Sequence, residues 1–571
     1  MQPTAERHVR IVLSQAVAWI PFIFGVWLSV VKIVGPHFDF LPGDLGDNRF
    51  INYILEHFHR WITGKDPTFW NAGFFYPFPN VITYSDNLFG VGPFYAFFRW
   101  LGLDRETAFQ GWFVLGFILN YGAAVAVLLK LKFKPLAAGV GAFLFSFGMP
   151  LMHQENHAHM FYRFGVPLAC YFLLRFSEKP RLTTLSALCF FVVWQFYMTV
   201  YIGFFLILLL AAMTVLTPVF QSPSSLRDRL LFWPRCLMRA WTESSPIQRL
   251  FSFAVLLGLA VSLFILFRPY HQMSSTYGFA RQWDEVATML PRRRSYFQAD
   301  SSQIWGNLSR KLQGVPMRWE HQLFPGLAAL LLVFAGIVWR PRSQNRSASW
   351  LYLWAVVVLV GMTFYYRGVT LYRLIWPIPG LSNVRVVTRL TLVLLWPMSF
   401  FIAYIIDAWL RLRNRQPWLL WGTAVFMSGL LMTETLAFNH ATVKKADAKS
   451  RLDQVKNRIP VKTPQDRILI VAGDPDKPWF ENELDAMLVA QDLGCPVMNG
   501  YSSNFPGNYG PTYGCARIPE RIASYMFFAH ITDESFYLDM VKRIVPIGFD
   551  ECDRGMWLTM PSVSIPPKPF P

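Results

Sequence analysis

Long apolar segments separated by short polar ones set the pattern of this chain. A helix of about 20 apolar residues crosses roughly 30 Å of hydrocarbon. The pattern therefore predicts an α-helical polytopic membrane protein with about eleven transmembrane helices, and the 182–220 hairpin is the least well defined. The expected spans lie near residues 11–34, 109–129, 136–152, 162–174, 182–199, 200–220, 250–268, 322–339, 349–365, 389–409 and 417–436.

Composition supports the same class. The 571 residues are 53% hydrophobic, 17% aromatic and only 15% charged, and the mean hydropathy is +0.30. These values exclude an ordinary soluble protein. The formal charge of +18 lies in short stretches between apolar segments, so we expect no nucleic-acid partner. The first apolar segment is longer than a signal-peptide core and lacks a small-x-small cleavage site, which predicts a retained span.

The distribution of Lys and Arg predicts the topology. These residues are about three times as frequent in one set of connecting segments as in the other, and positively charged loops stay in the cytoplasm. The N-terminus is therefore expected inside an inner (cytoplasmic) membrane, and an odd number of spans places residues 437–571 in the periplasm or outside the cell. The basic set is 1–10, 130–135, 175–181, 221–249, 340–346 and 411–415; the external set is 35–108, 153–161, 269–321 and 366–388.

Two domains follow from this pattern. Residues 1–436 form a transmembrane domain with external loops, and residues 437–571 form a small exported α/β domain. In the latter, RILIVAG (467–473) reads as a strand, WFENELDAMLVAQDLG (479–494) as a helix and CPVMNG (495–500) as another strand. A Cys495–Cys515 disulfide is conceivable there, although Cys552 leaves an odd thiol. The loop NGYSSNFPGNYG (499–510) either contacts a glycan or forms turns.

The first external loop carries two acids, Asp44 and Asp47, in the sequence LPGDLGDNRFINYIL (41–55). Apolar residues then recur every three or four positions up to Ile62, which predicts a helix lying in the membrane interface. Either acid could cap this helix, because a carboxylate accepts its first backbone N–H groups. A single helix cap requires only one acid, so the other acid is a candidate catalytic residue.

Further motifs follow along the chain: FFYPFPN (74–80), YSDN (84–87), HQENHAHM (153–160), EHQLFPG (320–326) and LYRLIWPIPGLSNVRVVTRL (371–390). Their order after a first span and a Gly-Asp-x-x-Asp loop resembles bacterial multispanning glycosyltransferases of the GT-C superfamily. The resemblance covers most of the membrane part, and its motifs are loose. It implies a polyprenyl-phosphate-linked sugar as donor, delivered at the lipid bilayer, and an extracytoplasmic glycan, lipid or protein as acceptor.

The resemblance also implies roles for residues. Inverting transfer needs a base for the acceptor hydroxyl, and the family's acid in the first external loop matches Asp47, with Asp44 as second choice. Asp86 is a lesser candidate, as a second carboxylate or metal ligand, against an Asx-turn. Donor phosphate calls for arginine, and the external candidates are Arg373, Arg385 and Arg389.

The HQENHAHM motif supplies Glu155, His157 and His159 on the same expected side of the membrane. These side chains could bind acceptor hydroxyls or a divalent metal, although no cofactor is required by the pattern. Glu320 and His321 precede a later span and could line the same site.

Two other classes of function remain open. A lipid or glycolipid transporter or flippase would explain many spans, but it usually needs ionisable residues at membrane depth. The expected spans carry few of them: Lys32, Arg163, Asp407 and Glu434. A non-catalytic envelope assembly protein is the third class, and it predicts that an Asp47→Asn variant retains function.

Overall fold

A computed structural model describes residues 15–221, 225–378, 380–412, 415–463, 466–507, 509–510, 512–549 and 552–561. The expected inner segment 1–10 and the start of the first span, 11–14, lie outside these residues. The chain forms two compact units. The membrane unit comprises residues 1–36, 113–263 and 281–440, and the loop–tail unit comprises residues 37–112, 264–280 and 441–571.

Helices occupy every segment that the apolar pattern marked as a span. Among the described residues, 8 helices are long and apolar enough to cross a membrane. Shorter helices occupy three other expected spans, near 162–174, 182–199 and 322–339. The principal helices are α2 (Ile20–Gly25), α3 (Val31–Val34), α6 (Arg105–Lys130), α7 (Pro135–Phe147), α8 (Met149–Met152), α9 (Gly165–Glu178), α10 (Leu182–Met198), α11 (Val200–Gln221), α14 (Pro246–Tyr277), α17 (Leu327–Trp339), α18 (Arg346–Thr363), α20 (Leu390–Leu410) and α21 (Pro417–Leu436).

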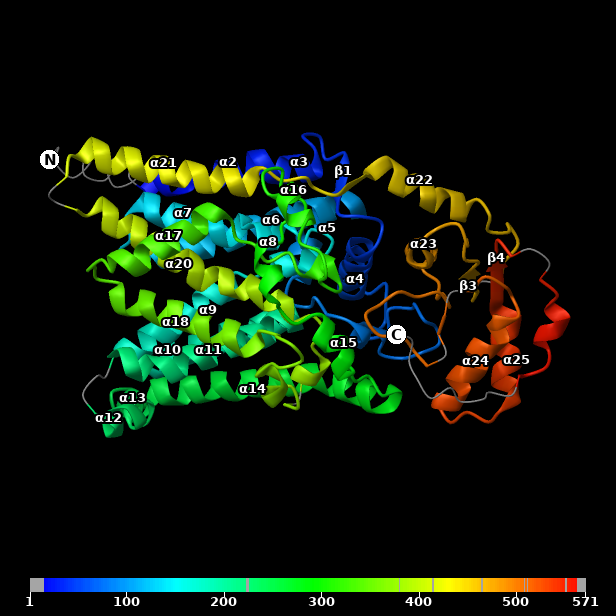
Figure 1. The fold of residues 1–571 in the computed structure, drawn as a ribbon. Coiled ribbons are helices and arrows are strands. Elements are labelled where there is room, and N and C mark those ends of the chain that lie inside the picture. The colour runs from blue at the N-terminus through cyan, green and yellow to red at the C-terminus, as the bar shows by residue number, and fades with distance from the viewer. Residues whose placement is uncertain are drawn as a thin grey trace, which may run out of the picture. The chain divides into compact units, whose positions relative to one another are not determined.

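Helix α20 is the core of the membrane unit. It packs against α7, α17, α18 and α21, and these helices run alongside one another in Figure 1. Small residues allow the close packing that helices in membranes require. A Cβ at Gly141 of α7 would lie 2.9 Å from the Ala403 Cβ, and one at Gly336 of α17 would lie 2.3 Å from the Ile405 Cδ1. Larger side chains at either glycine would push the helices apart.

The ionisable residues inside the bundle have structural partners. Arg163 donates to the backbone carbonyls of Phe145, at 2.7 Å, and of Leu392. Asp407 pairs with Arg411 at 2.7 Å. These contacts satisfy charges that a membrane interior would otherwise penalise. Structural pairing therefore accounts for these two residues without a transport path.

Glu434 of α21 has a similar structural role. Its carboxylate accepts the backbone N–H groups of Leu327, at 2.5 Å, and Ala328, at 2.8 Å. These groups belong to the first turn of α17, where the helix has no internal acceptors for them. Glu434 therefore caps a neighbouring helix.

Short helices and connections complete the membrane unit. They are η1 (Val17–Trp19), η2 (Val26–Val30), η4 (Ala158–Phe161), α12 (Leu226–Leu230), α13 (Phe232–Thr242), α15 (Trp283–Thr288), η5 (Arg293–Phe297), α16 (Gly306–Arg310), η6 (Arg318–Glu320), α19 (Tyr372–Ile375), η7 (Leu381–Asn383) and η8 (Val387–Arg389).

The loop–tail unit joins the first loop to the C-terminal region. Strand β1 (Phe40–Pro42) pairs antiparallel with β2 (Thr442–Lys444). The first loop thus shares a compact unit with the tail, whereas the sequence grouped it with the transmembrane domain. The other elements are α4 (Asp47–Ile62), η3 (Val81–Tyr84), α5 (Gly92–Trp100), α22 (Lys445–Lys456), β3 (Ile468–Val471), α23 (Trp479–Leu493), α24 (Arg517–Phe528), α25 (Glu534–Arg543), β4 (Ile544–Ile547) and η9 (Arg554–Trp557).

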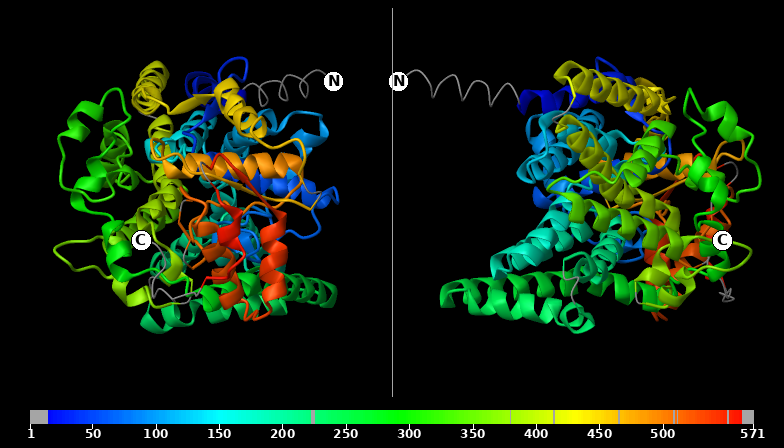
Figure 2. Two further views of the ribbon diagram at one scale, coloured as in Figure 1. Left: turned by 90° about the vertical axis from the view of Figure 1, so that its right-hand side faces the viewer. Right: turned by 60° about the vertical axis from the view of Figure 1, so that its left-hand side comes forward.

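A small α/β core lies in the tail. Strands β3 and β4 pair in parallel, with Ile468 opposite Ile544, and they lie beside α24 and α25 in Figures 1 and 2. The expected strand at 495–500 is reduced to one bridge between Val497 and Leu469. The expected strand and helix at 467–473 and 479–494 both form.

The amphipathic helix after Asp47 forms, but it is not a surface helix. Most of α4 is buried, including its polar face. Arg49 pairs with Asp485 of α23, and Gln491 of α23 donates to the Tyr53 carbonyl at 2.9 Å. The polar residues that suggested a membrane interface therefore find protein partners, and α4 is a core helix of the loop–tail unit.

Candidate active site

Asp44 and Asp47 have different places at the start of α4. Asp44 is exposed, and its Oδ1 accepts the Gly46 backbone N–H at 2.8 Å, which closes a tight turn. Asp47 is the first residue of α4, where the positive helix end favours a negative charge. Asp44 therefore accepts the hydrogen bond that closes the turn, and this turn does not require Asp47.

Asp47 is held by a residue far away in the sequence. The Tyr501 hydroxyl donates to Asp47 Oδ1 at 2.5 Å, a short hydrogen bond of the kind expected for a charged acceptor. Asp47 is half-buried. The hydrogen bond thus gives the carboxylate a defined orientation, and part of the residue's surface stays exposed.

Aromatic rings surround Tyr501. Its ring centroid lies 5.7 Å from Trp479, 6.1 Å from Phe480 and 5.8 Å from Phe50. Trp479, Phe480 and Tyr501 are each half-buried, so their rings keep some accessible surface beside the carboxylate. Amphipathic rings that expose a face next to a polar group provide both an apolar contact and a hydrogen bond. We call Asp47, Trp479, Phe480 and Tyr501 the carboxylate–aromatic site.

A second group of candidate residues lies in the membrane unit, around Arg389. Its Nη2 and Nε donate to the two carboxylate oxygens of Glu320 at 2.6 and 3.2 Å, and Nη2 also donates to His157 Nε2 at 2.8 Å. Arg389 and Glu320 are buried.

The environment of Glu320 favours its ionised form. Burial opposes ionisation, but the charge and hydrogen bonds of Arg389 outweigh it, so the pKa of Glu320 lies below its usual value. Two hydrogen bonds join the buried Arg389 and Glu320 side chains, and removing either partner would leave the other charge buried without compensation. Arg389 is therefore fixed in place by Glu320.

Arg385 joins this group through Tyr201. The backbone N–H of Arg385 donates to the Tyr201 hydroxyl at 3.2 Å, and the Arg389 guanidinium lies 5.6 Å from the Tyr201 ring centroid. Arg281 and Arg385 share one carboxylate, Glu285, at 3.4 and 3.6 Å. Three arginines thus lie around two carboxylates, Glu285 and Glu320. We call Arg281, Arg385 and Arg389, with Glu285, Glu320 and Tyr201, the arginine group.

Glu155 has a partner that the sequence pattern did not reveal. His440 Nδ1 donates to Glu155 Oε2 at 2.9 Å, and both side chains are buried. His159 lies beside His157, with ring centroids 6.3 Å apart. Within the described ranges, no group of three or more His, Cys, Asp or Glu side chains could hold a metal ion.

Two candidates have structural partners. His321 Nδ1 lies 2.7 Å from the Ser295 hydroxyl and Nε2 lies 2.9 Å from the Thr288 carbonyl, so both ring nitrogens are engaged. Burial lowers the pKa of His321, which keeps the ring neutral. Arg373 is exposed and stacks over Trp283 at 5.2 Å. Neither side chain has a hydrogen bond to Arg389 or Arg385 in the described part of the chain.

Asp86 lies in the loop–tail unit, half-buried near α14. Its neighbour Ser85 accepts the Tyr270 hydroxyl through its backbone carbonyl at 2.9 Å. The turn bond that the motif suggested is made by Asn87, whose side-chain oxygen accepts the Phe89 N–H at 2.9 Å.

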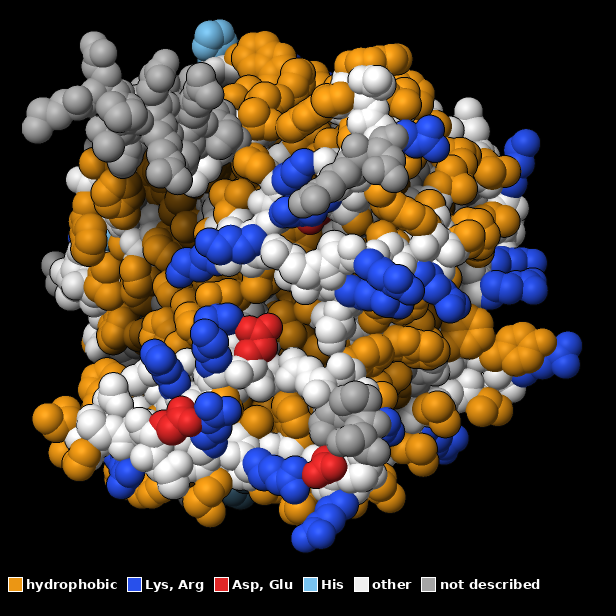
Figure 3. Space-filling model, turned by 90° about the vertical axis from the view of Figure 1, so that its left-hand side faces the viewer, with side chains coloured by type: hydrophobic (Ala, Val, Ile, Leu, Met, Phe, Trp, Pro, Cys, Tyr) orange, Lys and Arg blue, Asp and Glu red, His pale blue; other side chains and the backbone are white. Residues whose placement is uncertain are grey.

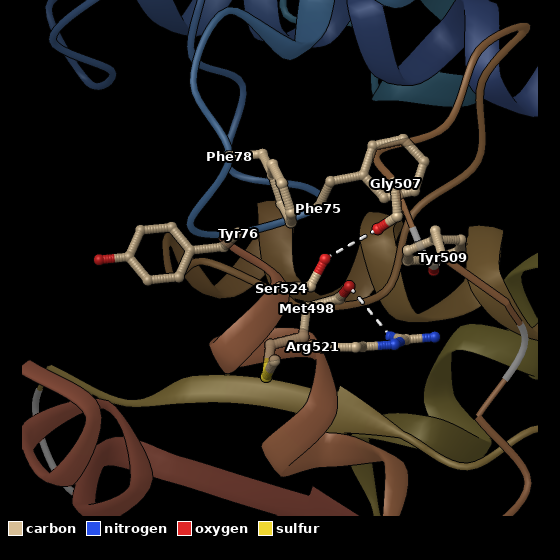
Figure 4. A pocket seen from close by; sticks show the side chains of 8 residues that line it. All are labelled: Phe75, Tyr76, Phe78, Met498, Gly507, Tyr509, Arg521 and Ser524. Carbon is tan, nitrogen blue, oxygen red and sulfur yellow. Dashed lines mark hydrogen bonds between the residues drawn. The ribbon is translucent and has the colours of Figure 1, made fainter. Parts of the chain in front are cut away.

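A small pocket opens within the loop–tail unit (Figure 4). The Arg521 guanidinium stacks on Tyr509 at 4.3 Å and donates to the Met498 carbonyl at 3.2 Å. The Ser524 hydroxyl donates to the Gly507 carbonyl at 3.0 Å. The protein itself satisfies these polar groups. Their contacts hold together the segments that line the pocket, 75–78 and 498–524.

Six participants were missed from the sequence: Tyr201, Arg281, Glu285, His440, Trp479 and Phe480. Tyr201 lies inside an apolar run and His440 follows a span, so local pattern gave no signal for either. Tyr501 lies in the loop that we expected to contact glycan or form turns. Its hydrogen bond to Asp47, which only the tertiary structure reveals, identifies Tyr501 as part of the candidate site.

Comparison with known proteins gives a distant likeness. No family model and no curated protein matches the chain. It is similar to the archaeal oligosaccharyltransferase AglB from Archaeoglobus fulgidus in complex with an inhibitory peptide and a dolichol-phosphate, at 12% identity over 91% of this chain and 68% of that one, with a TM-score of 0.48.

Two further structures of the Archaeoglobus fulgidus oligosaccharyltransferase are similar to the same degree. The apo form has 14% identity over 90% of this chain and 68% of that one, with a TM-score of 0.46. The complex with Zn and sulfate has 13% identity, coverages of 90% and 66%, and a TM-score of 0.47. TM-scores this low do not establish a shared fold, so the function must be argued from the residues.

Proposed function

We propose that this protein is a membrane glycosyltransferase of the GT-C type. It moves a sugar from a polyprenyl-phosphate donor to an acceptor outside the cytoplasm. The observation that carries the proposal is the carboxylate–aromatic site: a half-buried Asp47, oriented by Tyr501 and bordered by partly accessible rings. The sequence resemblance points to the same aspartate.

Asp47 is the general base in this proposal. As the acceptor hydroxyl oxygen forms a bond to the anomeric carbon, its proton passes to the Asp47 carboxylate. The bond between that carbon and the phosphate oxygen breaks, and the electron pair leaves with the polyprenyl phosphate. Attack from the side opposite the leaving group inverts the anomeric centre. A carboxylate in hydrogen-bond reach of the hydroxyl suits this step.

The arginine group is the proposed site for the donor phosphate. Charge builds up on the phosphate oxygens as the glycosidic bond breaks, and fixed cations stabilise that charge. Arg389 is preorganised by Glu320, and Arg385 retains the more accessible guanidinium. The guanidinium groups attract an anionic lipid phosphate through charge-assisted hydrogen bonds.

A test compares the envelope glycans of wild-type, deletion and Asp47→Asn strains by mass spectrometry. The substitution keeps the size of the side chain and removes its basicity. We expect one sugar to be missing in both mutant strains, with the Asp47→Asn protein still present in the membrane. Normal glycans in the deletion strain would rule out the transferase, whereas normal glycans in the Asp47→Asn strain alone would rule out Asp47 as base.

A further inference from the structure

A basic hollow lies at one end of the membrane unit, where α17 ends, α18 begins and α20 ends. It has a volume of about 710 Å³. Four arginines line it: Arg340, Arg342, Arg346 and Arg411. The lining also includes apolar side chains, among them Trp339 and Leu412. We call this the basic pocket, and no part of the proposed transfer reaction uses it.

Among the described residues, carboxylates balance only part of the charge of the basic pocket. Arg411 pairs with Asp407 at 2.7 Å and donates to the Lys132 carbonyl at 2.6 Å. For the three other arginines, no carboxylate within 4.0 Å occurs among the described residues. Like charges gathered around one hollow repel one another, and a bound anion removes that repulsion. The pocket therefore has the electrostatics of an anion site.

Local geometry adds to this preference. Arg346 is the first residue of α18, so the positive end of that helix dipole is at the pocket. The side-chain oxygen of Ser343 is buried with no hydrogen-bond partner among the described residues. A buried hydroxyl without a partner costs free energy unless a ligand or water satisfies it. Planar guanidinium groups bind phosphate oxygens in pairs.

The surroundings indicate the source of the phosphate. Figure 3 shows the end of the bundle with Lys and Arg side chains gathered among hydrophobic ones. Trp339 is 39% exposed and ends an apolar helix, as expected of a residue at the boundary between hydrocarbon and head groups. A free phosphate would gain nothing from these apolar side chains, whereas a lipid would pack against them.

We propose that the basic pocket binds the phosphate head group of an anionic phospholipid. The phosphodiester accepts hydrogen bonds from Arg342 and Arg346, and the glycerol and upper acyl carbons lie against Trp339 and Leu412. Basic pockets between helix ends on the cytoplasmic side of a membrane favour such lipids. The topology expected from the Lys and Arg distribution places the basic pocket on that side, so its lipid is distinct from the donor.

The test uses the full-length protein in detergent with three probes: dihexanoylphosphatidylglycerol, dihexanoylphosphatidylcholine and inorganic phosphate. Binding is measured by native mass spectrometry and by the shift in melting temperature. The Arg342→Gln/Arg346→Gln variant is compared with Arg181→Gln/Arg227→Gln, which removes two exposed arginines elsewhere in the basic segments. We expect phosphatidylglycerol to bind the wild type and the control within twofold of each other, and the pocket variant at least tenfold more weakly.

Three results would overturn the proposal. Equal loss of binding in both double variants would show attraction to general surface charge. Equal affinity for phosphatidylcholine would show that the anionic head group is not recognised. Full competition by inorganic phosphate at the same concentration would show a site for the free ion. If the double variant fails to fold, Arg342→Gln alone serves, with an expected loss of about threefold, and unchanged binding would contradict the proposal.

Discussion

Tyr501 and Asp47 lie 454 positions apart in the chain, yet the tyrosine hydroxyl donates a 2.5 Å hydrogen bond to the aspartate. The bond belongs to the loop–tail unit, in which the first loop and the C-terminal region fold together. The tail is thus part of the structure that orients the proposed base. If Asp47 is the base, the C-terminal region contributes to its orientation through Tyr501.

Removing the Tyr501 hydroxyl should slow transfer without abolishing it. Tyr501→Phe keeps the ring packed against Trp479 and deletes one charge-assisted hydrogen bond, which contributes about 1.5–3 kcal/mol. If most of that energy orients the base, the rate of sugar transfer falls by roughly tenfold or more. The measurement is transfer by membranes containing equal amounts of each protein. Tyr513→Phe, at a half-exposed ring in the same unit, is the matched control, and equal rates in the two variants would contradict the role of Tyr501.

Arg385 should affect donor binding more than Arg373 does. Arg385→Gln removes a cation of the arginine group, so we expect the KM for the lipid-linked donor to rise by about tenfold. Arg373→Gln removes an exposed side chain stacked on Trp283, and its KM should stay within about twofold of wild type. Steady-state kinetics over a range of donor concentrations distinguishes these outcomes. A larger effect at Arg373 would move the phosphate site away from the arginine group.

The Arg389–Glu320 pair should make stability depend on pH. The pKa of Glu320 is lower in the folded protein than its usual value, so the pair stabilises the fold at pH above about 4.3. That contribution is lost as the pH falls through the folded pKa. Glu320→Gln should cost about 3 kcal/mol near neutral pH, because Arg389 loses a buried partner.

Melting temperatures between pH 3 and 7 measure this effect. The difference between wild type and Glu320→Gln should be largest near neutral pH and should shrink as the solution is acidified. Asp474→Asn provides a control, since Asp474 pairs with Lys477 in an exposed turn and such pairs contribute little. A difference for Glu320→Gln that stays constant with pH would show that its charge is not what stabilises the pair.

The thiols of the tail should pair differently from the sequence-based expectation. Cys515 packs in the core of the tail, and Cys552 packs against the same cluster of buried residues. Cys495 instead contacts the Ala490 carbonyl, at 3.8 Å. If the tail is exported, oxidation should join Cys515 to Cys552 and leave Cys495 as a thiol.

Peptide mapping after alkylation without reductant tests this pairing. A Cys515–Cys552 bridge should stabilise the protein by about 3–4 kcal/mol, and Cys552→Ser should remove that gain. Burial raises the pKa of Cys552 to about 12, so this thiol reacts slowly with alkylating reagents when reduced. Recovery of a Cys495–Cys515 peptide would contradict the pairing.

Much of the fold could be predicted from the sequence because membrane helices depend on local composition. Within the ranges that the structure describes, a helix occupies each apolar segment marked as a span, since backbone groups in lipid must be satisfied within the segment. The place of α4 could not be predicted. Its alternating polar and apolar residues suit a membrane surface and a buried helix equally well, and only Asp485 and Gln491 of α23 decide between them.

The candidate site likewise contains residues that the sequence predicted and residues that it did not. Glu320, Arg389 and His157 come from three separate motifs in the sequence, and the structure brings them into hydrogen-bond contact. Arg281 and Glu285 carried no distinctive pattern, because charge pairing across loops is a tertiary property. Asp44 and Asp47 were distinguishable only in part from the sequence, since either could start the helix. The turn bond to Gly46 and the Tyr501 bond separate their structural roles.

The central claim is that Asp47 acts as the base while Asp44 shapes the turn. The most direct measurement is sugar transfer by the purified wild type, Asp47→Asn and Asp44→Asn proteins, with the native lipid-linked donor extracted from membranes. Asparagine at position 44 keeps an oxygen acceptor for the Gly46 N–H. We therefore expect transfer within about threefold of wild type for Asp44→Asn, and a loss of at least a thousandfold for Asp47→Asn, with unchanged melting temperatures. Near-normal transfer by the Asp47→Asn protein would contradict the account.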